Sequence, residues 1–344
     1  MQGAAVTNPP LLAVQDLQTR FFRPGGEVVR AVDGLSYQLA AGEAVAIVGE
    51  SGSGKSVSVR SLLGLLPPAG RVVGGEAWFG GQDLLKLPER ALRRVRGREI
   101  AMVFQDAMTA LNPTFTIQRQ LIEPLLWHDI CRRAEARERA LKALADVGMD
   151  RPELRLRQYP FQLSGGMRQR AMIAMALVTQ PKLLIADEPT TALDVTLQRQ
   201  ILDIFKTLKE RGMAIIMITH DLGVARYFCD SVVVMYAGKV MERGPVAEFI
   251  EHPRHPYSRG LLESTLEVGQ SARRLAPIAG SPPDLAHRPS GCPFHPRCAL
   301  AEERCRHEEQ TLESFAAGRE AACWKVTEGA KAHATGGSGP HQGL

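Results

Sequence analysis

The chain has 344 residues, of which 44% are hydrophobic, and a formal net charge of +5 at pH 7. This composition is typical of a globular protein with a sizeable core, in one large domain or two modest ones. No stretch approaches the roughly 18 uninterrupted apolar residues of a membrane span, and residues 1–10 lack the basic and apolar regions of a secretory signal. The mild positive charge suits nucleotide phosphate or a lipid surface as well as nucleic acid. We therefore expect a cytosolic chain whose membrane role, if it has one, is peripheral.

Short apolar runs alternate with helical patterns, which predicts an α/β protein with a mainly parallel sheet. The expected strands are Ala44–Val48, Ile100–Phe104, Lys182–Ala186, Ala214–Thr219 and Val232–Tyr236. Apolar residues at helical spacing predict one helix over Cys131–Val147 and a second around Leu197–Leu208, closed by Gly212.

The composition divides the chain into three regions. Residues 1–250 form the expected main domain, in which about 106–170 contains helical pattern without a good strand and reads as an inserted helical subdomain. Residues 251–325 are richer in His, Pro and Arg and carry four of the six cysteines. Residues 326–344 are mostly Gly, Ala, His and Ser, which predicts a disordered tail.

A glycine-rich loop follows the expected strand Ala44–Val48 and opens a helix. It fits the Walker A pattern G-x-x-x-x-G-K-[ST], whose backbone N–H groups turn inward around phosphates at a helix N-terminus. The residues of this expected phosphate cradle are Gly49, Glu50, Ser51, Gly52, Ser53, Gly54, Lys55 and Ser56. Lys55 would reach the β- and γ-phosphates, and the Ser56 hydroxyl would bind Mg²⁺. The motif indicates nucleotide binding but does not say which class of NTPase this is.

Two acidic residues end the expected strand Lys182–Ala186. The carboxyl ends of parallel strands form the edge where ligands of open α/β sheets bind. We expect Asp187 to serve Mg²⁺ as the Walker B acid. Glu188 is then placed to orient and polarise the attacking water as a catalytic base.

A second glycine turn, Ser164-Gly165-Gly166, stands between the two Walker motifs and opens a helix. The segment Leu163–Arg170 resembles the signature of ABC ATPases, with Met167 where many members carry Gln. The resemblance covers about residues 11–244 and implies a P-loop NTPase fold with a mixed-sheet core.

The same resemblance assigns the smaller motifs. It implies that Gln105 is the Q-loop glutamine that contacts Mg²⁺, that Ala192–Asp194 is the D-loop, and that His220 is the switch histidine at the γ-phosphate. An aromatic residue stacks on adenine in the family, and Phe21 is the expected one, with Phe22 as the alternative. The family also implies a dimer in which the signature of one subunit completes the Walker A site of the other.

The C-terminal region narrows the resemblance. The segments His255–Leu262, Gly280–Pro283 and Gly291–Cys298 look like the extension of oligopeptide and dipeptide importers, and Gln105–Pro113 is similar to their Q-loop region, with Ala107 and Ala110 in place of Pro and Ser. This implies an ATPase that powers peptide uptake at the cytoplasmic face of a bacterial inner membrane. The implied partners are a similar but different ATPase (a second copy being the alternative), two membrane permease subunits and, indirectly, an extracytoplasmic peptide-binding protein.

Four cysteines lie close together in this extension: Cys292, Cys298, Cys305 and Cys323. Clustered thiols in a reducing cytosol favour metal binding over disulfides. They lack the paired C-x-x-C of most zinc sites, and thiolates alone suit zinc or an iron–sulfur cluster. The importer resemblance implies a [4Fe–4S] cluster, with His295 as a spare ligand.

Three other functions stay open at this stage. A soluble ABC ATPase acting on DNA or ribosomes commonly has two ATPase halves or a long coiled coil, and this chain has one Walker A motif and no sustained heptads. A P-loop kinase or GTPase would lack the Ser164–Gly166 signature and His220. Transport of nickel, glutathione or another small solute remains compatible with the sequence, because this chain does not choose the cargo.

Overall fold

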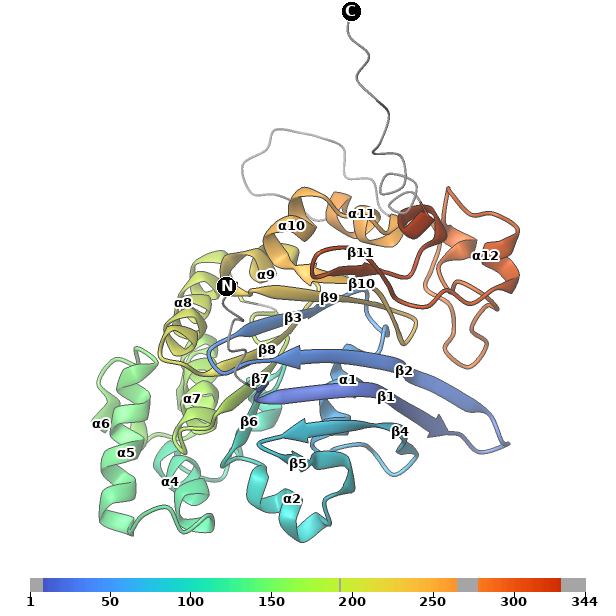
Figure 1. The fold of residues 1–344 in the computed structure, drawn as a ribbon. Coiled ribbons are helices and arrows are strands. Elements are labelled where there is room, and N and C mark those ends of the chain that lie inside the picture. The colour runs from blue at the N-terminus through green and yellow to red at the C-terminus, as the bar shows by residue number, and fades with distance from the viewer. Residues whose placement is uncertain (1–8, 192, 265–277, 329–344) are drawn as a thin grey trace, which may run out of the picture.

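The protein is described by a computed structural model that covers residues 9–191, 193–264 and 278–328. An eight-stranded mixed sheet forms the centre, with strand order β11-β12-β10-β9-β3-β8-β7-β6 (Figure 1). The strands from β9 to β6 in this order are parallel, and β10, β12 and β11 continue the sheet antiparallel. Their bounds are β3 Ala44–Val48, β6 Ile100–Val103, β7 Leu183–Asp187, β8 Ala214–Thr219, β9 Ser231–Tyr236, β10 Lys239–Pro245, β11 Glu313–Ala316 and β12 Arg319–Ala321.

A smaller antiparallel sheet lies beside the central one, with strand order β2-β1-β4-β5 (Figure 1). Its strands are β1 Leu12–Phe22, β2 Val28–Leu39, β4 Gly70–Phe79 and β5 Gln82–Asp83. A single buried cluster joins this sheet, the helix after the phosphate loop and one face of the central sheet, and it includes Leu12, Leu35, Val45, Val59 and Leu62. The small sheet therefore packs over the helix that carries the phosphate loop.

Twelve α-helices have both ends within the described residues, and residues 324–328 are also helical. They are α1 Lys55–Leu62, α2 Glu89–Val95, α3 Ala107–Ala110, α4 Ile117–Trp127, α5 Arg133–Asp146, α6 Pro152–Leu156, α7 Gly165–Leu177, α8 Val195–Glu210, α9 Leu222–Phe228, α10 Val246–Glu251, α11 Pro256–Glu263 and α12 Arg304–His307. Three 3₁₀ turns accompany them: η1 Leu84–Lys86, η2 Pro160–Gln162 and η3 His295–Arg297. Across the described parts of the chain, no helix is both long and apolar enough to cross a membrane.

The predicted α/β core is confirmed. Strands β3 and β8 have the predicted bounds, β6 and β9 differ from the prediction by one residue at one end, and β7 is shifted by one residue at both ends. The predicted helical insertion corresponds to α3–α6 and the start of α7, which form a lobe at one side of the molecule (Figure 1). The helix predicted over Cys131–Val147 is shorter and runs over Arg133–Asp146.

The C-terminal extension is not a separate body, because its strand β12 pairs with β10 of the central sheet. Arg319 of β12 and Glu242 of β10 form a buried ion pair at 3.1 Å. The fold also continues past the predicted start of the tail, since the backbone N–H groups of Val326 and Thr327 donate to the Cys323 carbonyl oxygen. The remainder of the predicted tail, from residue 329, lies outside the described residues.

Candidate functional site

The phosphate loop joins β3 to α1 and is shaped by two glycines with positive φ. Gly49 has φ 149° and Gly54 has φ 103°. A Cβ atom at Gly49 would lie 2.2 Å from the carbonyl oxygen of Met235, and one at Gly54 would lie 2.2 Å from that of Ala31. Because real Cβ atoms do not approach backbone so closely, any side chain at either position would force the loop open.

Polar groups inside this loop are arranged for an anion. The ammonium of Lys55 donates to the carbonyl oxygens of Gly49 at 2.7 Å and Glu50 at 2.8 Å. Burial lowers the pKa of Lys55, while the nearby Glu188, Asp187 and Glu50 carboxylates oppose that shift. The hydroxyl oxygen of Ser53 is buried and has no hydrogen-bond partner among the described residues. An unpaired buried hydroxyl beside a lysine fits a loop whose polar groups are completed by phosphate.

The Mg²⁺ residues predicted from the two Walker motifs do meet. The Ser56 hydroxyl at the start of α1 donates to Asp187 Oδ1 at the end of β7 over 2.7 Å. Arg60 lies 3.3 Å from the other carboxylate oxygen of Asp187, whose side chain is 2% exposed. A hydroxyl and a carboxylate facing each other are oxygen ligands of the kind Mg²⁺ uses beside nucleotide phosphates, so these residues fit the ion.

Glu188 gathers three polar side chains around one carboxylate oxygen. Its Oε2 lies 3.3 Å from Gln105 Nε2, 3.0 Å from Thr191 Oγ1 and 3.5 Å from His220 Nδ1. Its backbone has φ 48°, and its N–H donates to the Ile218 carbonyl oxygen at 3.0 Å. A non-glycine residue held in the left-handed region directly after a buried strand is typical of a functional turn. The structure thus brings Gln105, Glu188 and His220 together, and Thr191 is a further member of this group that the sequence reasoning did not name.

The signature turn occupies a different helix start from the phosphate loop. The Ser164 hydroxyl caps α7 by accepting from a first-turn N–H at 3.3 Å, while Gly165 faces open space. A Cβ at Gly166 would lie 2.6 Å from Leu197 Cδ2, so this turn packs against α8. Asp194 caps α8 by accepting from the Leu197 N–H at 2.8 Å. The signature and the D-loop aspartate are therefore neighbours at the starts of two adjacent helices.

The contacts described so far do not include the predicted adenine-stacking residue Phe21 or Ala192 of the D-loop. Phe21 pairs with Gly70 of the adjacent strand β4, and a Cβ at Gly70 would lie 2.8 Å from the Phe21 ring. The neighbouring Phe22 is 45% exposed. Stacking of Phe21 on adenine stays a prediction. Ala192 of the D-loop lies outside the described residues.

The four cysteines of the extension line one small cavity together with His255, Phe294 and His295. Burial and the other three thiols raise the pKa of Cys292 to about 11. Among the described residues, no three Cys, His, Asp or Glu side chains are arranged closely enough to hold a metal ion. The fit to a metal is thus partial: the ligands share a cavity without a coordination geometry, and the iron–sulfur prediction is not supported. The spare ligand His295 instead hydrogen bonds through Nδ1 to the Cys292 carbonyl oxygen.

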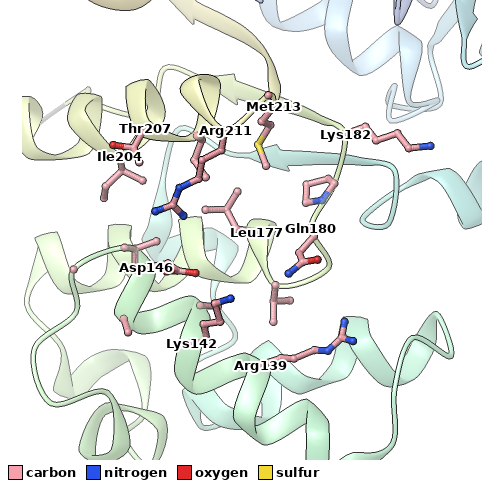
Figure 2. A pocket seen from close by; sticks show the side chains of 18 of the residues that line it. Arg139, Lys142, Asp146, Leu177, Gln180, Lys182, Ile204, Thr207, Arg211 and Met213 are labelled. Carbon is pink, nitrogen blue, oxygen red and sulfur yellow. The ribbon is translucent and has the colours of Figure 1, made fainter. Parts of the chain in front are cut away.

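A larger cavity of about 740 Å³ lies between the helical lobe and α8. Side chains from α5, the end of α7 and the end of α8 line it, including Arg139, Lys142, Leu177 and Arg211 (Figure 2). Arg139 pairs with Glu135 on its own helix. Its lining includes Arg170, the last residue of the signature segment, but no residue of the phosphate loop, Gln105, Asp187, Glu188 or His220, so its size does not mark the catalytic centre.

These observations define an ATPase of the ATP-binding cassette class: a phosphate loop, a Walker B pair, and a helix-capping signature on an inserted lobe. Family models agree. Residues 32–191 match the ABC transporter model, and residues 241–305 match the model for the C-terminal region of oligopeptide/dipeptide transporters. Among solved structures, a dimeric ATP-binding cassette in a post-hydrolysis state with ADP and Pi aligns with a TM-score of 0.61 at 29% identity, covering 68% of this chain and 98% of that one.

Relatives of known role are closer in sequence. The chain is 50% identical to the oligopeptide transport ATP-binding protein OppD of Salmonella typhimurium over 92% of this chain and 94% of that protein. It is also 50% identical to the dipeptide transport ATP-binding protein DppD of Bacillus subtilis, over 84% of this chain and 86% of that protein. The chain belongs to this family of oligopeptide and dipeptide ABC transporter ATPases.

Proposed function

We propose that this chain hydrolyses ATP to power the uptake of di- and oligopeptides through an ABC importer. The observation that carries the proposal is the meeting of Gln105, Thr191 and His220 at Glu188, next to the Ser56–Asp187 pair of the two Walker motifs, in a chain that also has the peptide-importer extension. Relatives named for oligopeptide and dipeptide transport support the peptide cargo. Uptake of nickel, glutathione or another small solute is the alternative.

The geometry suggests how the residues act. The phosphate loop and Lys55 bind the phosphates, and Phe21 would stack on the adenine. Ser56, Asp187 and Gln105 would hold Mg²⁺, which when bound would neutralise charge on the phosphates. Glu188 accepts a proton from the attacking water. The Gln105 amide and the Thr191 hydroxyl around Oε2 hold the Glu188 carboxylate in position.

His220 faces the same carboxylate oxygen and would contact the γ-phosphate as it develops charge. The signature residues Ser164, Gly165 and Gly166 and the D-loop Asp194 would complete the ATP site of a facing subunit. We expect that subunit to be a similar but different ATPase, with a second copy of this chain as the alternative. Two ATP would then be enclosed between the subunits.

A candidate surface for the membrane subunits lies beside the Q-loop. A cavity of about 710 Å³ is lined by residues of α4 and of the loop before it, including Asn112, Phe115 and Trp127. Trp127 is 71% exposed and Met108, in α3, is 65% exposed. Exposed large apolar side chains beside a cavity mark a protein interaction site. We infer that permease subunits dock here, which would place the chain at the cytoplasmic face of a bacterial inner membrane.

For the extension we propose a [4Fe–4S] cluster held by Cys292, Cys298, Cys305 and Cys323, with zinc as the alternative. The observation behind it is that the four thiols line one cavity. A bound cation would hold the thiols as thiolates against the burial that raises the pKa of Cys292. Metal analysis and the visible absorption spectrum of anaerobically purified protein test this, with Cys305→Ser as the comparison. Metal-free protein would refute the proposal.

The transport proposal is tested in liposomes that contain this chain with its co-expressed permease and ATPase partners. ATP hydrolysis is measured with and without a peptide-binding protein loaded with a dipeptide or an oligopeptide. Stimulation by loaded binding protein is the expected result. Activity that ignores peptides and permeases but rises with nucleic acid or ribosomes would overturn the transport proposal and leave the ATPase intact.

A further inference from the structure

The C-terminal extension contacts the phosphate loop at Glu50. The Arg297 guanidinium forms a two-point ion pair with the Glu50 carboxylate, at 2.6 Å from NH1 and 3.0 Å from NH2. The Tyr257 hydroxyl accepts a hydrogen bond from the Glu50 backbone N–H at 2.8 Å. The side chain and the backbone of one loop residue are therefore both held by the extension.

The arginine is itself fixed by its surroundings. Its side chain is 5% exposed. Its remaining donors reach the carbonyl oxygens of Ala279 at 2.8 Å and Ile278 at 3.1 Å, and the Tyr236 hydroxyl at 3.2 Å. A bidentate pair whose arginine is buried and fully hydrogen bonded fixes geometry in a way that a surface ion pair does not.

The same arginine belongs to the turn between Cys292 and Cys298, which is the cysteine-bearing turn of the extension. Arg297 ends η3, between Cys292 and Cys298, and its N–H donates to the Phe294 carbonyl oxygen at 3.0 Å. Phe294 packs on Tyr236 and Tyr257 with ring centroids 5.3 Å apart in both pairs. The turn, the aromatic rings and the phosphate loop thus form one continuous packed unit.

Glu50 also contacts Lys55, the lysine of the phosphate loop, through its backbone. Its carbonyl oxygen accepts from Lys55 Nζ at 2.8 Å and from the Ser53 N–H at 3.2 Å. A shift of Glu50 would therefore move both the lysine and the loop that receive phosphate. We propose that Arg297 is a positioning residue for ATP binding, which acts through Glu50 and makes the phosphate loop depend on the cysteine-bearing turn of the extension.

A double-mutant cycle on the full-length chain tests this proposal, with the fluorescent nucleotide MANT-ATP and Mg²⁺ as the probe. Arg297→Ala and Glu50→Gln are each expected to weaken binding by about tenfold, and the double variant by no more than either single change, because contacting residues couple. In steady-state hydrolysis the KM for ATP is expected to rise with kcat held within about twofold. Arg297→Lys keeps the positive charge but loses the two-point contact of the guanidinium with Glu50. It is expected to bind MANT-ATP more tightly than Arg297→Ala and less tightly than the wild type.

Arg288→Ala is the matched control. Arg288 also joins the extension to the cassette by a half-buried ion pair, at 2.6 Å to Asp33, but Asp33 lies on β2 and not in the loop. Unchanged MANT-ATP affinity in Arg288→Ala supports the proposal, and weakening equal to that of Arg297→Ala overturns it. Additive effects of Glu50→Gln and Arg297→Ala, or wild-type affinity in Arg297→Ala, overturn it too.

The inference deepens the proposed ATPase function and rests on it. Failure of the wild-type chain to bind MANT-ATP would defeat both, whereas wild-type binding without coupling would defeat the inference alone. Thermal unfolding of each variant shows whether it is folded. If the loss of MANT-ATP binding disappears when the variants are compared at an equal folded fraction, Arg297 is not a positioning residue.

Discussion

The Thr191 hydroxyl lies 3.0 Å from Oε2 of Glu188. Glu188 precedes Thr191 by three residues in the chain. The contact closes a tight turn between the catalytic carboxylate and the D-loop. It gives Glu188 a partner on its own segment, in addition to Gln105 and His220 from the segments that follow β6 and β8. The orientation of the base is therefore set partly by local structure.

Thr191→Val removes this hydroxyl at nearly constant volume. We expect kcat to fall roughly tenfold or more, because a hydrogen bond to a charged group is worth about 1.5–3 kcal/mol, while the KM for ATP changes little. Phosphate release measured against ATP concentration checks this. Thr207→Val on α8, whose hydroxyl donates to the Asp203 carbonyl oxygen, is the control. Equal kcat in the two variants would contradict the assigned role.

Glu188→Gln removes the base but keeps the size of the side chain. Turnover should fall by roughly 10²–10⁴, while MANT-ATP binding remains and the nucleotide-bound dimer persists in size-exclusion chromatography. Glu138→Gln on the exposed face of α5 should hydrolyse ATP normally. Normal turnover by Glu188→Gln would show that another group activates the water.

Lys55→Ala removes the ammonium that lines the phosphate loop. Nucleotide affinity should fall by more than about thirtyfold, because charge-assisted contacts with phosphate are lost. MANT-ATP titration measures this effect, with Lys206→Ala on the exposed side of α8 as a matched loss of charge. Unchanged affinity in Lys55→Ala would refute the phosphate-loop assignment.

His255 gives the extension a pH dependence. Burial lowers its pKa to about 4 from the usual 6.5, and its Nδ1 accepts from the Tyr257 N–H at 3.0 Å, which requires the neutral ring. Because the unfolded chain binds the proton first, stability conferred by the neutral ring is complete above pH 6.5. It is lost as the pH falls from 6.5 towards 4, by up to about 3 kcal/mol.

Chemical unfolding between pH 4 and 7.5 measures this loss. His255→Gln cannot titrate, so its free energy of unfolding should fall less over that range than that of the wild type. Identical slopes for the two proteins would assign the pH dependence to other groups.

The sequence by itself determined the parts of this protein that are written in consecutive residues. Three local patterns have a chemistry that follows from residue spacing: the Gly49–Ser56 loop, the apolar run before Asp187 and the Ser164–Gly166 cap. Strands β3 and β8 are buried along their whole length, so a continuous apolar run was enough to predict them. The antiparallel sheet went unpredicted. Register shifts between Val14 and Leu17 and again near Thr19 break the alternation by which such strands are recognised.

Only the tertiary structure decided which distant residues meet. Gln105 and Glu188 are 83 residues apart, and Glu50 and Arg297 are 247 apart. Such pairs depend on the strand order and on how the extension joins the sheet through β12. Neither of these can be read from a short stretch of consecutive residues. Side-chain chemistry is therefore readable from the chain, whereas the partner of each side chain follows from packing.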